Sequence, residues 1–96
     1  MISFAEPAHP GRVLKDNYLD PLNMSAGALA ARIETSSILL SHLVKGDVAI
    51  TAETALRLAH VFATTPEYWM NLQRDYDLHW ARKRVSLRQI EPVSLS

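Results

Sequence analysis

The sequence predicts a small all-α fold, a bundle of five helices followed by a short C-terminal tail. Apolar residues recur at three- and four-residue steps in five segments between residues 10 and 84, which is the period of an amphipathic helix. Polar capping residues and prolines stand where these segments would begin. With 96 residues, one domain is expected. We therefore divide the chain into a flexible N-terminal arm (residues 1–9), a helical domain (10–84) and a tail (85–96).

The centre of the chain, residues 24–46, predicts two short helices joined by a tight corner. The first helix is expected from Ser25 to about residue 33, and the second begins after Ser36 and ends at Gly46. Residues 34–36 between them are polar and supply hydroxyl groups that can cap the second helix. The inner face of the second helix holds Leu40, Leu43 and Val44. Two helices with this short connection match a helix-turn-helix.

Three further helices flank this pair. Pro10 opens the first, which is expected to end near residues 18–20, and Thr51 caps the fourth. Thr65 and Pro66 begin the fifth, which runs to about Arg84. The expected apolar faces are Val13, Leu14, Tyr18 and Leu22 in the first helix, Ala55, Leu58, Ala59 and Phe62 in the fourth, and Trp69, Leu72, Tyr76 and Trp80 in the fifth. The aromatic residues of the fifth helix are expected in core or dimer packing.

The composition limits the classes of function. Ten Lys and Arg residues balance ten Asp and Glu residues, so the chain lacks the overall basic charge that supplies most non-specific DNA affinity. It has no cysteine, which excludes disulfides and Cys-ligated zinc. No apolar run reaches the ~20 residues of a membrane span, and the N-terminus lacks the features of a signal peptide. We expect a cytoplasmic protein with no membrane partner.

No pattern of catalytic residues is visible. The four histidines, His9, His42, His60 and His79, are scattered without the spacing of metal ligands. There is no HExxH motif, no Gly-rich phosphate loop and no constellation for a nucleophile. We expect a protein that is not an enzyme and that holds no cofactor and no metal.

Several short motifs occur in an order that resembles a known family. They are HPG at 9–11, LDPL at 19–22, LSHLVKG at 40–46 and TPEYWMNLQRDYDL at 65–78. The chain resembles the HigA family of antitoxins (VapI-like), which belong to the lambda-repressor-like, or XRE, helix-turn-helix regulators. The resemblance implies that residues 10–84 form a DNA-binding domain and that the protein is the antitoxin of a type II toxin-antitoxin module. It would neutralise a HigB-like mRNA-cleaving toxin and, as a dimer, bind double-stranded operator DNA to repress its own operon.

The candidate DNA-binding residues lie on the outward face of the second central helix, which a helix-turn-helix places in the major groove. They are Ser36, Ser37, Ile38, Ser41, His42 and Lys45. The resemblance implies that Ser37, Ile38 and His42 face bases and that Ser36 and Lys45 lie near phosphates. A serine can bond any base, an isoleucine can cover a thymine methyl, and a histidine can bond a purine edge.

The sequence departs from the family at the same surface. Many members carry an arginine in place of Ser37, a basic residue in place of His42 and a glutamine in place of Ala26, and the usual glycine of the turn is Glu34. Each lost bidentate contact is worth roughly 1–3 kcal/mol of base discrimination. The sequence therefore predicts a weak or altered operator preference.

Two alternatives remain open. The chain could be a solitary XRE-type regulator without a toxin, or a protein-interaction module whose DNA-binding face has decayed. We also expect a homodimer, because two recognition helices are needed for half-sites ~34 Å apart. The fifth helix with the tail is the first candidate for the dimer surface, and the first helix is the second. Asp16 and Asp20 would suit a basic toxin.

Overall fold

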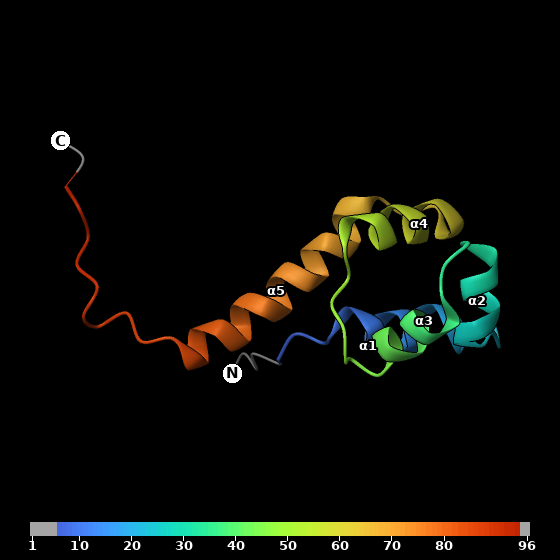
Figure 1. The fold of residues 1–96 in the computed structure, drawn as a ribbon, viewed down its shortest axis with the longest axis horizontal. Coiled ribbons are helices and arrows are strands. Elements are labelled where there is room, and N and C mark those ends of the chain that lie inside the picture. The colour runs from blue at the N-terminus through green and yellow to red at the C-terminus, as the bar shows by residue number, and fades with distance from the viewer. Residues whose placement is uncertain (1–5, 95–96) are drawn as a thin grey trace, which may run out of the picture.

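The computed structural model describes residues 6–94, which hold five α-helices and one π-helical turn but no strand. The elements are α1 (Pro10–Leu14), the π-helical turn η1 (Lys15–Leu19), α2 (Ala26–Arg32), α3 (Ser37–Val44), α4 (Ala52–Phe62) and α5 (Pro66–Arg84). Figure 1 shows α1 to α4 grouped together, whereas α5 runs out of this group and the chain beyond it leads away from the helices. The predicted all-α fold of five helices is confirmed. In residues 6–94, no helix is both long and apolar enough to span a membrane.

Hydroxyl caps begin four of the helices, as the sequence predicts. In each cap the side-chain oxygen accepts a hydrogen bond from the backbone N–H three residues further on, which satisfies one of the amides left free at a helix start. The four pairs are Ser25 with Ala28 (3.0 Å), Ser36 with Leu39 (3.2 Å), Thr51 with Thr54 (3.3 Å) and Thr65 with Tyr68 (3.1 Å). These local bonds explain why the helix starts could be placed from sequence.

The inward face of the first helix differs from the prediction. The backbone N–H of Asp20 bonds the carbonyl of Lys15, five residues back, at 2.9 Å. This π-helical turn inserts extra backbone into the helix, so residues after it are rotated relative to an ideal α-helix. As a result Leu19 is buried and Leu22, which the four-residue spacing predicts to be buried, is 55% exposed.

Trp69 lies at the centre of the core. Its side chain is fully buried, its ring lies 5.2 Å from that of Tyr18, and its Nε1 donates to the Thr64 hydroxyl at 2.8 Å. The fully buried leucines around the core are Leu14, Leu29, Leu40, Leu43 and Leu58. Trp80, expected on the same side of α5 for core or dimer packing, is 37% exposed and lies outside this core.

The HPG motif joins the start of α1 to the end of α3. The His9 Nδ1 accepts from the backbone N–H of Gly11 at 2.9 Å and so caps α1. A Cβ atom on Gly11 would lie 1.6 Å from the carbonyl oxygen of Leu43, so only glycine permits this approach of α1 to α3. The His9 ring lies near Gly46 and packs edge-on against Tyr76 of α5, with ring centroids 4.9 Å apart. One short motif therefore connects three helices.

Gln73 connects α5 to the loop between α3 and α4. Its Oε1 accepts from the buried backbone N–H of Ile50 at 2.7 Å, and its Nε2 donates to Asp77 at 2.9 Å. The glutamine is itself buried. A buried amide without such a partner is costly, so Gln73 sets the position of the loop that follows α3.

The predicted arm lies partly outside the described residues, because residues 1–5 are not among them. Within the described part, the Glu6 carboxylate lies 3.2 Å from the Lys83 Nζ and 3.9 Å from the His79 Nε2, both on α5. The division of the chain into arm, domain and tail stays a prediction.

Candidate nucleic-acid interface

The predicted DNA-binding residues lie together on the outward face of α3. Ser36 caps the helix and Lys45 follows its last turn. Of the six residues, five are exposed and Ser41 is half-buried; the exposed ones are Ser36, Ser37, Ile38, His42 and Lys45. The opposite face of α3 carries Leu40 and Leu43, which are buried. The structure thus brings the candidate residues onto one accessible surface.

His42 has a partner, Asp47, that the sequence pattern does not predict. Its Nδ1 lies 3.4 Å from a carboxylate oxygen of Asp47. The turn after α3 makes this contact: Gly46 adopts a φ of 82°, and the backbone N–H of Asp47 bonds the His42 carbonyl at 2.9 Å. The carboxylate orients the imidazole and adds negative charge beside the proposed DNA-binding face. Gly46 at the helix end predicts a turn, but the sequence does not predict that this turn brings the Asp47 side chain back to His42.

Lys45 is the free cation of this surface. In the part of the chain that the structure describes, its side chain has no hydrogen bond or ion pair. It borders a cleft of about 290 Å³ between the start of α1 and the end of α3, which His9 and Arg12 also line. Burial lowers the pKa of His9 below its usual value, and the backbone at Val48 partly opposes this shift. His9 therefore favours its neutral form, which the helix cap requires because Nδ1 must keep a free lone pair to accept the hydrogen bond from the Gly11 N–H.

The turn between α2 and α3 is held from α4. Glu34 stands there with a φ of 58°, in the left-handed region that glycine adopts most easily. The Arg57 Nη1 donates to the carbonyl of Ile33 at 2.7 Å, and its Nη2 pairs with Glu53 at 2.9 Å. The pair of Arg57 with Glu53 joins neighbouring turns of one helix, whereas Arg57 and Ile33 are 24 positions apart, so no local pattern predicts their bond.

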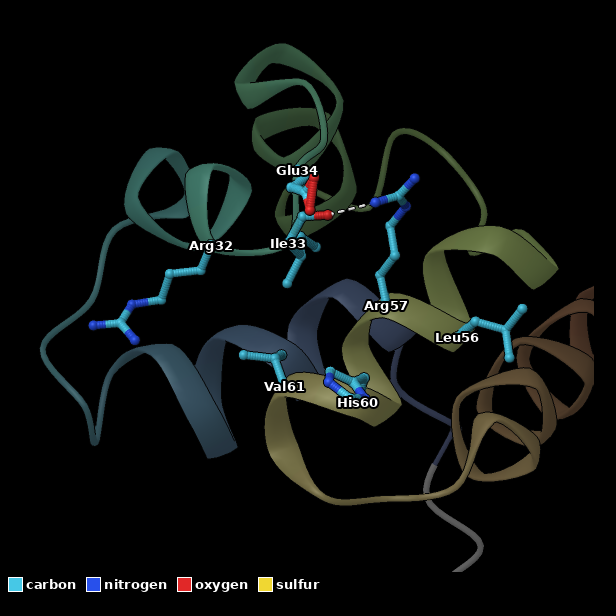
Figure 2. Close-up of a pocket in the computed structure, with 7 residues that line it drawn as sticks. All are labelled: Arg32, Ile33, Glu34, Leu56, Arg57, His60 and Val61. Atoms are coloured by element: carbon cyan, nitrogen blue, oxygen red, sulfur yellow. Dashed lines mark hydrogen bonds between the residues drawn. The ribbon is translucent and has the colours of Figure 1, made fainter.

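A pocket of about 310 Å³ lies between this turn and α4. Figure 2 shows Ile33 above Val61 and His60, with Arg57 reaching across to the Ile33 carbonyl. Leu56 is 59% exposed at its edge. The guanidinium of Arg57 is already bonded to the Ile33 carbonyl. We therefore interpret it as a residue that stabilises the helix-turn-helix rather than as the binding group for a charged ligand in this pocket.

The acidic residues of the first helix are paired within the chain. Asp16 lies 2.7 Å from the Arg12 guanidinium, and Asp20 lies 2.9 Å from the Lys15 ammonium. A basic partner would have to compete with these cations for the carboxylates. Among residues 6–94, no group of three or more His, Asp or Glu side chains is placed to hold a metal ion.

The comparisons with known proteins agree with this architecture. A family model described as helix-turn-helix matches residues 17–69, more than half of the chain. The chain is 37% identical to an addiction module antidote protein of the HigA family from Coxiella burnetii, with a TM-score of 0.86 over 93% of this chain and all of that one. This chain belongs to the HigA family of helix-turn-helix proteins.

Two further relatives support the HigA assignment. Virulence-associated protein I of Dichelobacter nodosus is 39% identical over 87 residues, which are 90% of this chain and 81% of that protein. A Pseudomonas aeruginosa antitoxin HigA, solved with the higBA promoter, is 34% identical to this chain, with a TM-score of 0.82. The match covers 92% of this chain and 99% of that one. The resemblance found in the sequence motifs is therefore confirmed. The HigA family consists of DNA-binding regulators and antitoxins of the XRE type and is not an enzyme family.

Proposed function

We propose that this HigA-family protein is an antitoxin that binds operator DNA through α3, represses its own operon as a homodimer, and neutralises a HigB-like mRNA-cleaving toxin. The observation that carries the DNA-binding part is the accessible outward face of α3, on a fold shared with an antitoxin solved with its promoter. A recognition helix of a helix-turn-helix contacts base edges from such a face.

Each residue of the face has a proposed role. Ser37, Ile38 and His42 face the bases, where a hydroxyl, an aliphatic group and an imidazole can each meet a base edge. Ser41 lies between them on the same face. Lys45 neutralises a phosphate, and the α3 start at Ser36 lies against another. Each phosphate that a cation such as Lys45 neutralises releases counterions, so the affinity should fall as the salt concentration rises.

The direct test measures binding of the protein to the DNA upstream of its own gene, by fluorescence anisotropy in the presence of competitor DNA. We expect specific binding that His42→Ala weakens. The matched control is His60→Ala, because His60 is also an exposed histidine in the last turn of a helix but lies on α4. Absence of specific binding by the wild-type protein, or equal losses in both variants, would contradict the proposed role of α3.

A homodimer follows from the need for two recognition helices on one operator. The end of α5 and the chain beyond it support this proposal because they expose apolar side chains that need a partner surface. These are Leu78, Trp80, Val85, Leu87, Ile90 and Val93. Sedimentation of the full chain at micromolar concentration should give a dimer, and Leu87→Glu with Ile90→Glu should shift it to a monomer. A wild-type monomer would refute the dimer.

The toxin is proposed to bind away from α3, so that one protein can hold both partners. Co-expression with the product of the adjacent small gene, followed by co-purification, tests this directly. If no such gene lies next to this one, the solitary regulator becomes the better description. If a toxin is bound but Ser37→Ala with His42→Ala leaves all activity intact, the protein is an interaction module, a reading favoured by the carboxylate of Asp47 beside His42.

A further inference from the structure

Ile38 is an unusual residue for the outward face of a helix. Its side chain is 70% exposed, which makes it the most exposed large apolar side chain of the described α-helices; the next, Leu56, is 59% exposed. It occupies the second position of α3, at the end of a recognition helix that comes closest to base edges. An aliphatic side chain at this position gains free energy only when something covers it.

The neighbouring side chains on α3 do not cover Ile38. Ser37 precedes it and Ser41 lies one turn further on, and both have short side chains. His42, four residues on, has its Nδ1 within 3.4 Å of Asp47. The hydroxyl of Ser36 accepts the N–H of Leu39 at 3.2 Å. Of these neighbours on α3, only His42 has a polar side chain of comparable length, and its Nδ1 is already paired with Asp47.

The same face lacks the groups that read purines by paired hydrogen bonds. Arginine to guanine and asparagine or glutamine to adenine are the bidentate contacts of the major groove. Residues 36–45 contain none of these three residue types, and Lys45 lies at the far end of the helix. The one feature of the major groove that an aliphatic side chain recognises is the 5-methyl group of thymine.

We infer that Ile38 contributes to reading the operator by covering a thymine methyl group in each half-site. The inference rests on the proposed binding of DNA by α3 and adds the chemistry of the base that is recognised. Burial of one methyl group at ~0.8 kcal/mol corresponds to about a fourfold change in affinity. Ser37 and Ser41 then permit close approach of the helix rather than carrying the discrimination.

The test uses the region of upstream DNA that the protein protects in a footprint, prepared as a synthetic duplex. Each thymine is replaced in turn by deoxyuridine, which pairs identically but lacks the methyl group. Wild-type protein should lose about fourfold in affinity at one thymine of each half-site and little elsewhere. Ile38→Ala should bind the normal duplex more weakly and no longer distinguish thymine from deoxyuridine at that position. Ser37→Ala should keep the distinction.

A second measurement separates a methyl contact from an effect on DNA shape. With a cytosine at the sensitive position, 5-methylation of that cytosine should restore part of the affinity for wild-type protein but not for Ile38→Ala. Leu56→Ala, which removes the exposed leucine of α4, is the control and should behave like wild type. Specific binding without any deoxyuridine effect, or an effect that persists in Ile38→Ala, overturns this inference alone. Absence of specific binding overturns the proposed function as well.

Discussion

Gly11 and Gly27 should respond in opposite directions to the same substitution. Both glycines lie in helices, where alanine is normally favoured by about 0.5–1 kcal/mol. The surroundings of the two positions differ. A Cβ on Gly11 would lie 1.6 Å from the Leu43 carbonyl oxygen and 2.6 Å from the Leu43 carbonyl carbon. A Cβ on Gly27 would meet only the Ser25 hydroxyl, at 3.9 Å.

The magnitude for Gly11→Ala follows from the displacement it forces. Non-bonded atoms rest about 3.5 Å apart, so α1 and α3 must separate by roughly 2 Å. The obstructing atoms belong to backbone and cannot rotate away. Overpacking of this kind costs about 1–3 kcal/mol, which exceeds the gain in helix propensity. We expect a net loss of about 2 kcal/mol, or a fall in Tm of roughly 8–16 °C for a domain of this size.

Urea unfolding followed by circular dichroism at 222 nm measures both variants under the same conditions. Gly27→Ala should raise the free energy of unfolding by about 0.5–1 kcal/mol. Gly11→Ala should lower it and also weaken DNA binding, because α3 moves. If Gly11→Ala proves as stable as the wild-type protein, the close approach of α1 to α3 is wrong.

Three further substitutions test the contacts around the helix-turn-helix. Gln73→Leu keeps the side-chain volume but leaves the buried Ile50 N–H without its acceptor, and should lower the free energy of unfolding by about 1–3 kcal/mol in urea titrations. Arg57→Met removes the bond to the end of α2 and should cost about 1–2 kcal/mol, whereas Arg74→Met, at an exposed position, should change stability by less than about 0.5 kcal/mol. Because burial lowers the pKa of His9, the unfolded state binds more protons below about pH 6.5, so stability should fall on acidification. His9→Asn, which retains a cap acceptor, should flatten this part of the pH profile; an unchanged profile would exclude His9 as the cause.

Much of the helical framework could be predicted because the signals that define it are local. The caps at Ser25, Ser36, Thr51 and Thr65 each involve a bond across three residues. The family motifs were likewise readable, and the comparisons confirm the assignment they suggested. The prediction that Leu22 is buried was wrong, because the structural feature responsible is not visible in the local sequence pattern. A π-helical turn leaves no clear mark in residue spacing, so the four-residue period predicted the wrong inward face there.

The proposed DNA-binding surface could likewise be predicted only in part. Its residues could be placed on one face from helical periodicity alone, and their roles toward DNA stay predictions. The partners around them could not be predicted. Asp47 reaches His42 only because the chain reverses at Gly46, and the cations that pair with the acids of the first helix depend on side-chain geometry.

The sequence by itself determined the helix boundaries, the helix-turn-helix and the membership of the HigA family. These rest on capping, periodicity and short motifs, which act over a few residues. The tertiary structure decided how the helices are held together. The contact of Gly11 with Leu43, the bond of Arg57 to Ile33 and the bond of Gln73 to Ile50 all join residues more than twenty positions apart. Such contacts depend on how the helices pack, because packing brings together residues that are far apart in the chain and leaves a buried group such as the Ile50 N–H dependent on its protein partner.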